Sequence, residues 1–219
     1  MNRKLPANAK PLLILAIALF LSSCKSNSQS VVFSDECAIP CWRGITPGET
    51  HFQDAVNAVK KFPDYESKRS GISDKWNIFS NFIGFYLKTG EDIRVYAIDD
   101  VVAVISFSNT RGITFKNFAE EFGDPKYVAR STAMGRGPLW SESPHVWLTA
   151  ISPEKGVAYN YDTAGNLRLT HNRIVVFIDF FDVNLYEKLL NDYFFMGEEQ
   201  VELYDWKGYG NIDELYPVK

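Results

Sequence analysis

The chain has few residues in the patterns that usually carry catalysis or bind metal ions. Its only histidines, His51, His145 and His171, stand in separate segments, so no two of them have metal-ligand spacing. The sequence lacks both the Gly-x-Ser-x-Gly turn of many serine hydrolases and the His-Glu-x-x-His pattern of zinc hydrolases. We therefore predict a protein with no catalytic residues, no metal and no cofactor. The alternative is a hydrolase assembled from distant residues, with His145 or His171 beside carboxylates.

Two of the three cysteines lie close together, at Cys37 and Cys41, with Pro40 between them. Thioredoxin-like redox centres separate their cysteines by two residues and place the first at a helix N-terminus, which lowers its pKa. Here the spacing is three residues, and the surrounding Pro and Gly residues indicate a loop. In an oxidising compartment such a pair favours a structural disulfide, which we predict. A reactive redox pair and two free thiols are the alternatives.

Identical acidic residues stand side by side at Asp99-Asp100, Glu120-Glu121 and Glu198-Glu199. Neighbouring side chains point apart on a strand or a helix, so such pairs do not readily share a proton. We expect Asp99-Asp100 to form a hairpin turn with its charges in solvent. Residues 160–166 have only a faint likeness to a calcium-binding loop, and we interpret them as a solvated turn.

Aromatic residues are abundant, with 16 Phe, 11 Tyr and 5 Trp. Most of the Phe residues occur at periodic positions that indicate a buried core. Several Tyr and Trp residues alternate along predicted strands, so one open face of a sheet could present Tyr96, Trp147, Tyr159 and Tyr161 together. Amphipathic rings of this kind are enriched at protein interfaces and also suit stacking on sugars. We predict these four as partner-binding residues, and the alternative is that half of them fill the core or its edge.

Residues 1–23 have the layout of a signal peptide. Three basic residues precede an apolar run over 11–21, which is shorter than the roughly 20 residues needed to cross a bilayer. The sequence Leu21-Ser22-Ser23-Cys24 resembles the lipobox of bacterial lipoproteins. This resemblance implies cleavage before Cys24 and attachment of fatty acyl chains such as palmitate to that residue. A plain secretory signal with an incidental cysteine is the alternative.

Cleavage would make the protein more acidic. It removes three of the 23 basic residues and none of the 27 acidic ones, so the net charge changes from −4 to −7. Such a balance repels polyanions and argues against nucleic acid as a partner. Residues 25–30 form a short polar tether, and no Asp follows Cys24 as an inner-membrane retention signal. We expect an exported protein, lipid-anchored to the outer face of the cell membrane or to the outer membrane.

Helix signals occur three times in the remaining sequence. Thr50 and Gln53 have capping-box spacing, and apolar residues then recur at helical spacing, which predicts a helix over about 51–61. Thr114 predicts a second helix with Phe115, Phe118, Ala119 and Phe122 on one face and Ile113 packed onto Phe118; Gly123 and Pro125 end it. A final helix is predicted over 185–193.

Strand-like sequence follows each of the first two helices. Segments rich in β-branched and aromatic residues predict three strands at 78–87, 93–98 and 101–107, and four more at 126–132, 146–151, 157–161 and 174–181. The helix entries Gly44-Ile45-Thr46 and Gly112-Ile113-Thr114 are alike, about 70 residues apart. We therefore predict an α+β fold of two helix-then-antiparallel-meander repeats, with the helices packed on one face of the sheet.

The predicted organisation has four parts. They are a signal peptide (1–23), a lipidated cysteine and tether (24–34), a first α+β repeat with the Cys37/Cys41 loop (35–111), and a second repeat with a C-terminal helix and tail (112–219).

Residues 112–128 resemble two families. They place a Gly and a Thr before a predicted helix, and Gly-x-Pro and a strand pair after it. These are the outer-membrane assembly lipoproteins of the SmpA/OmlA type and the tandem-repeat β-lactamase-inhibitor proteins. The match is looser over 44–65, where Phe62 replaces the Gly expected before Pro63. Residues 37–48 also resemble the start of uncharacterised bacterial lipoproteins, a likeness that implies no function.

The resemblance to the SmpA/OmlA and β-lactamase-inhibitor families implies helices on one sheet face and a free opposite face that holds a partner. The anchor, the tether and the missing catalytic constellation predict a lipid-anchored, non-enzymatic binding or scaffolding protein of the cell envelope. It would contact the membrane through its anchor and display the sheet face and the Cys37–Gly48 loop to another envelope or exported protein. An inhibitor or sensor of an exported enzyme or small ligand is the alternative.

Overall fold

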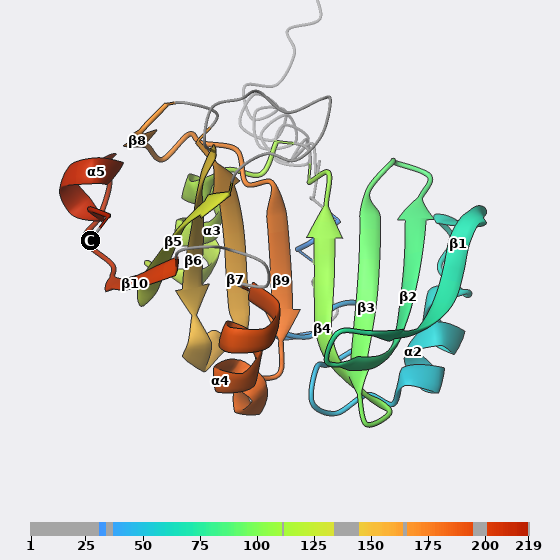
Figure 1. Cartoon of the computed structure of the whole chain (residues 1–219). Coiled ribbons are helices and arrows are strands. Elements are labelled where there is room, and N and C mark those ends of the chain that lie inside the picture. Colours follow the sequence, from blue (N-terminus) through green and yellow to red (C-terminus); the bar gives the residue numbers. More distant parts are fainter. Residues whose placement is uncertain are drawn as a thin grey trace, which may run out of the picture.

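A computed structural model describes residues 31–33, 37–110, 112–133, 145–163, 166–194 and 201–218. Within these ranges the main element is a nine-stranded antiparallel sheet with strand order β1-β2-β3-β4-β9-β7-β6-β5-β10 (Figure 1). Its strands are β1 (Tyr65–Trp76), β2 (Phe79–Leu87), β3 (Asp92–Ile98), β4 (Val101–Ser108), β5 (Tyr127–Ala133), β6 (His145–Ser152), β7 (Val157–Asp162), β9 (Phe177–Phe181) and β10 (Val201–Asp205). The expectation of a mixed fold with a large antiparallel sheet is confirmed.

The helices of the described chain are short. They are α2 (Phe52–Val59), α3 (Phe115–Phe122), α4 (Tyr186–Leu189) and α5 (Ile212–Leu215). A 3₁₀ turn, η3 (Val183–Leu185), leads into α4, and a π-helical turn, η4 (Leu190–Phe194), continues it; a further 3₁₀ turn, η2 (Pro153–Lys155), precedes β7. A small ribbon pairs β8 (Arg168–Leu169) with β11 (Gly210–Asn211). None of the helices in the described part of the chain has the length and hydrophobicity needed to cross a membrane.

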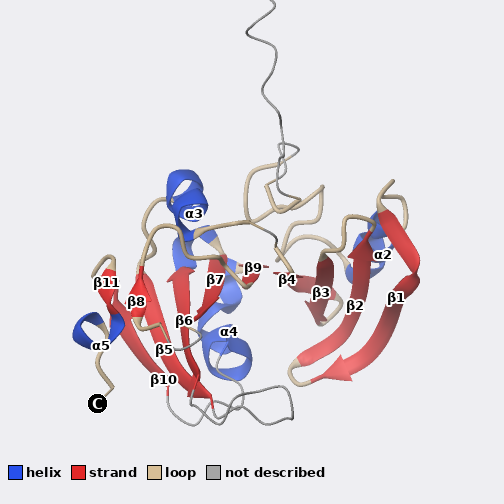
Figure 2. Ribbon diagram, turned by 90° about the horizontal axis from the view of Figure 1, so that it is seen from above, coloured by secondary structure: helices blue, strands red, loops and turns tan. Residues whose placement is uncertain are grey.

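The sheet is curved, and Figure 2 shows α4 on the inside of the curve and α3 on the outside. The outer, convex face carries the larger core, to which α2 contributes Val56 and Val59 and α3 contributes Phe118. Trp42, from the loop before α2, is fully buried in this core and packs edge-on against Phe107 with ring centroids 5.2 Å apart. Apolar burial on this face therefore holds α2, α3 and the entry loop against the sheet.

The inner, concave face carries a second core that covers only part of the sheet. It includes Phe79, Tyr96 and Phe181 from the strands and Leu189 from α4, with Tyr193 of η4 packed at its edge. Since side chains alternate along a strand, the residues two positions away from these also point to the concave side.

The N-terminal cap of α3 forms as predicted, but that of α2 does not. The Thr114 hydroxyl accepts a hydrogen bond from the Asn117 backbone N–H, and the Asn117 side chain accepts one from the Thr114 N–H. In α2 the capping position is His51, which makes no side-chain cap. Thr50 instead accepts from the Thr46 N–H at 2.8 Å, and its carbonyl accepts from the Val102 N–H. Pairing with the β3–β4 hairpin therefore fixes the start of α2.

The Asp99-Asp100 pair forms the β3–β4 hairpin turn, as predicted. Both residues have positive φ, 49° and 65°, and the flanking residues Ile98 and Val101 pair across the hairpin. Positive φ at both central positions is the backbone of a type I′ turn, whose twist matches that of the strands.

Several boundaries differ from the predictions. Two edge strands, β1 and β10, were not predicted, so four strands rather than three follow α2. The strand predicted over 174–181 begins at Phe177, and the helix predicted over 185–193 is split into the α4 and η4 turns. Strand β9 pairs with both β4 and β7, so the segments 35–111 and 112–219 contribute to one continuous sheet. The predicted signal peptide, Cys24 and residues 25–30 of the tether lie outside the described residues.

Candidate functional site

The Cys37/Cys41 loop is attached to the convex core. The two cysteines form a disulfide, as predicted. The Trp42 indole N–H donates to the Val31 carbonyl at 2.8 Å. The Arg43 guanidinium donates to both carboxylate oxygens of Asp64, at 2.7 and 2.8 Å, and lies over the Trp42 ring. These hydrogen bonds hold the pKa of Asp64 below its ordinary value. The contacts give this part of the loop a structural role.

The four aromatic residues predicted to bind a partner do not lie together. Tyr159 and Tyr161 are 1% and 2% exposed and belong to the convex core, where Tyr159 stacks on Phe118 with ring centroids 4.4 Å apart. Tyr96 is 3% exposed and belongs to the concave core, where its ring lies 5.8 Å from that of Tyr193.

The expectation of one open face that presents all four side chains is therefore wrong. The physical reason is that β3, β6 and β7, the strands that carry these residues, have packed side chains on both faces, so alternation along a strand could not identify which face was open. Of the four, Trp147 is the one that is only half-buried. It lies on the concave side, with its ring 6.3 Å from that of Phe177.

A line of polar and aromatic side chains crosses the concave face beside the smaller core. We call these five residues the concave row: Asp92, Ser108, Phe177, Asn160 and Thr149, one from each of the neighbouring strands β3, β4, β9, β7 and β6. Each is paired directly with the next in the sheet register, so all five point to the same side. All except Thr149 are half-buried rather than covered. The concave row and Trp147 therefore leave part of this face in contact with solvent.

A buried carboxylate lies beside this row on the concave face, two residues along β9 from Phe177. Asp179 of β9 is 3% exposed, is paired in register with Ser106, and accepts a hydrogen bond from the Tyr193 hydroxyl at 3.2 Å. Burial raises the pKa of Asp179 to about 6, although hydrogen bonds from Ser106 and Tyr193 act in the opposite direction. Burial also raises the pKa of Tyr193 well above its ordinary value. The cluster places a group that titrates near neutral pH under the η4 turn.

The histidines occupy different surroundings. His51 lies beside Asp100, with Nδ1 3.8 Å from Oδ2, and His171 stacks on Tyr209 with ring centroids 3.7 Å apart. The backbone of His145 begins β6, and its side chain is outside the described part of the structure. Over the residues that the structure describes, no group of three His, Cys, Asp or Glu side chains is placed to hold a metal ion.

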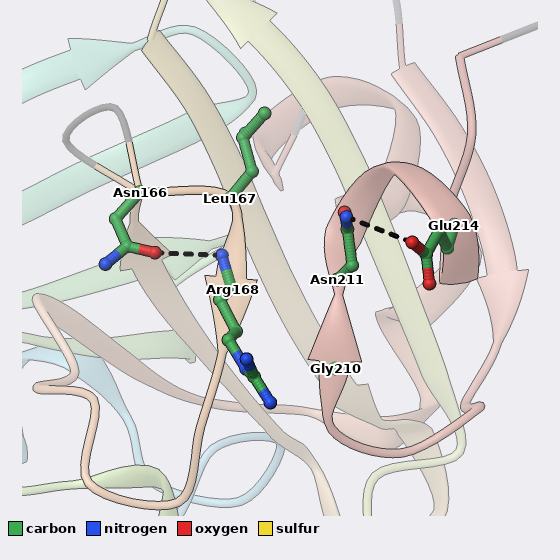
Figure 3. Close-up of a pocket in the computed structure, with 6 residues that line it drawn as sticks. All are labelled: Asn166, Leu167, Arg168, Gly210, Asn211 and Glu214. Atoms are coloured by element: carbon green, nitrogen blue, oxygen red, sulfur yellow. Dashed lines mark hydrogen bonds between the residues drawn. The ribbon is translucent and has the colours of Figure 1, made fainter.

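A separate hollow of about 530 Å³ lies between β8 and the β11–α5 segment, lined by Asn166, Leu167, Arg168, Gly210, Asn211 and Glu214 (Figure 3). Figure 3 shows Arg168 on one side of it and Asn211 and Glu214 on the other. Neither the hollow nor the concave row was predicted.

The single Asp in the apolar stretch Phe177-Ile178-Asp179-Phe180-Phe181 was the one local signal of an unusual polar residue.

Comparison of the chain with protein-family models, with curated proteins and with solved structures finds no match.

Proposed function

We propose that this protein is a lipid-anchored binding or scaffolding protein of the cell envelope, without catalytic activity, and that the concave row with Trp147 is its binding surface. The observation that carries the proposal is the incomplete cover of the concave face. The concave core is packed at one end of the sheet, whereas Phe177 and Trp147 stay half-exposed next to polar groups.

The composition of this surface suits a protein partner. Interfaces are enriched in aromatic residues and combine them with hydrogen-bonding groups at their edge. Phe177 and Trp147 supply aromatic area, and Asp92, Ser108 and Asn160 supply hydrogen-bonding groups in the same layer. The Asn160 side-chain oxygen is buried without a hydrogen-bond partner among the described residues, which leaves an unsatisfied acceptor beside this surface.

The anchor in this proposal is Cys24, lipidated after cleavage of residues 1–23. The polar tether at 25–30 would then hold the domain at the outer face of the cell membrane or at the outer membrane. Mass spectrometry of the protein from its native host tests this part. The expected product starts at Cys24 and carries acyl chains, and an intact leader or a free Cys24 thiol contradicts it.

Affinity capture of the full chain from cross-linked envelope membranes tests the binding surface. We expect the wild type to recover a partner in stoichiometric amount. We expect a variant that combines Phe177→Ala and Trp147→Ala to lose this partner. Ile72→Ala is the matched control, because Ile72 is also apolar, is 51% exposed and lies on the edge strand β1, paired with Ile83 of the convex core. Equal recovery with all variants contradicts the assignment of this surface.

The second candidate is an inhibitor or sensor of an exported enzyme or small ligand, which would follow from the tandem-repeat resemblance. We propose that the chain arose by duplication of a helix-then-meander unit, with the helices of both units on one sheet face. The order of elements supports this: α2 precedes β1–β4, and α3 precedes β5–β7. Specific binding of an exported protease or β-lactamase to the purified chain, with inhibition, would favour this candidate over a scaffold.

A further inference from the structure

We propose that the hollow between β8 and the β11–α5 segment binds a small zwitterion of the α-amino-acid class. Arg168 would contact the ligand carboxylate and Glu214 the ligand ammonium group. This site lies on a different surface from the concave row, and the inference goes beyond the proposed function.

The backbone around the hollow is firmly positioned. Arg168 and Asn211 are paired in the β8–β11 ribbon, and the Leu167 carbonyl accepts from the Ile212 N–H at 2.8 Å. Leu169 and Ile212, the apolar residues directly beside these, are buried in the convex core. The two sides of the hollow therefore keep their separation without a ligand, which lowers the entropic cost of binding.

The Asn211 amide orients the Glu214 carboxylate on one side of the hollow. The Asn211 side chain uses its oxygen to accept from the Asp213 N–H at 3.0 Å and its NH₂ group to donate to one Glu214 oxygen at 3.3 Å. The adjacent acid, Asp213, is already paired with the buried Arg130, with a nitrogen–oxygen distance of 2.7 Å. Glu214 therefore supplies the unpaired negative charge at this side, and its second oxygen has no partner among the described residues.

The opposite side presents a free cation. The Asn166 side-chain oxygen accepts from the Arg168 N–H at 3.1 Å and fixes the backbone from which the guanidinium extends. The guanidinium itself forms no ion pair or hydrogen bond with any part of the chain that the structure describes, and Arg168 and Glu214 do not pair with each other across the hollow. Arg168 and Glu214 line the same hollow without pairing, so a ligand that carries both complementary charges can form a charge-assisted hydrogen bond with each of them.

Size limits the ligand to a small molecule. A volume of about 530 Å³ falls within the range of pockets that hold metabolites and drug-sized molecules. A carboxylate receives two parallel hydrogen bonds from a guanidinium, whereas an ammonium group suits a single carboxylate, so the two charges of an amino acid have distinct places here.

Isothermal titration calorimetry with the full chain in detergent tests the proposal. The probes are the twenty free α-amino acids, followed by the N-acetyl and the amide derivatives of the best binder. We expect at least one free amino acid to bind, and each derivative, which lacks one charge, to bind at least about tenfold more weakly, as for the loss of one charge-assisted hydrogen bond.

Protein variants give an independent readout. Arg168→Gln and Glu214→Gln should each weaken binding by at least about tenfold. Lys116→Gln and Glu121→Gln, which change exposed charges on α3, should leave it unchanged. The proposal is overturned if no free amino acid binds at millimolar concentration, if the N-acetyl derivative binds as well as the free acid, or if the α3 variants weaken binding equally. These results do not depend on Phe177 or Trp147, so they leave the proposed binding surface to its own test.

Discussion

Replacing Asp179 with Asn should stabilise the protein at neutral pH and abolish one component of its pH dependence. Asp179 is buried beside the concave row, and ionisation there places a negative charge among aromatic rings and aliphatic side chains. The desolvation of that charge raises the pKa of Asp179 from 3.8 to about 6. The Tyr193 and Ser106 hydroxyls offset only part of this cost.

The magnitude follows from the difference between the two pKa values. A shift from 3.8 to about 6 corresponds to about 3 kcal/mol of stability at 1.36 kcal/mol per pKa unit. The folded state binds the proton more tightly than the unfolded state, so protonation of Asp179 favours folding. This contribution is fully present below pH 3.8 and is lost as the pH rises through about 6. Between pH 4.5 and pH 7.5 it should decline by about 2 kcal/mol.

Denaturant unfolding of the wild type and of Asp179→Asn at both pH values measures this component. We expect the free energy of unfolding of the variant, relative to the wild type, to rise by about 2 kcal/mol from pH 4.5 to pH 7.5. Asp205→Asn is the matched control, because Asp205 is exposed on β10, and it should show no such change. A wild type and an Asp179→Asn variant with parallel pH profiles, or a variant that loses relative stability at pH 7.5, would refute the reasoning.

Three further stability predictions follow from the convex core and its attached loop. Phe118→Ala should destabilise the protein by about 3–5 kcal/mol in thermal unfolding, because it removes a buried ring stacked on Tyr159; a loss below about 1 kcal/mol would show that the site collapses freely. Thr114→Ala should cost about 1 kcal/mol and Thr114→Ser much less, since only the hydroxyl caps α3; equal losses in urea unfolding would exclude the cap as the cause. Arg43→Gln should lower the free energy of unfolding by about 1 kcal/mol at pH 7. This loss should shrink as the pH falls below 3.8, because the lowered pKa of Asp64 contributes stability only while the carboxylate is charged. A loss independent of pH would contradict the pairing.

Several elements could be predicted from the sequence because interactions between residues close together in the chain form them. The Thr114 cap needs only Asn117 three residues later, and the Asp99-Asp100 turn needs only two residues that tolerate positive φ. The Cys37–Cys41 disulfide likewise joins residues four positions apart. Strand β1 gave no such signal, because Glu66, Lys68 and Ser70 have low strand propensity and an edge strand needs burial on few of its side chains.

The candidate sites depend on contacts between distant segments, which periodicity does not report. Phe177 and Asn160 are neighbours only because β9 inserts between β4 and β7. The Asp179 hydrogen bond comes from Tyr193 on η4, and that turn covers the part of the concave face that carries Tyr96. Tyr159 and Tyr161 alternate along β7 as predicted, yet the face they occupy was decided by where α3 packs.

Site-specific photo-cross-linking in living cells of the native host tests whether the concave row contacts a partner in the cell envelope. A photoreactive phenylalanine analogue at position 177 lies in the concave row, and the same analogue at position 116 lies on the exposed side of α3. We expect a discrete cross-linked envelope protein from position 177 that disappears with Trp147→Ala, and none from position 116. Cross-links of equal yield from both positions, or no cross-link from position 177 while the protein is folded and anchored, would contradict it.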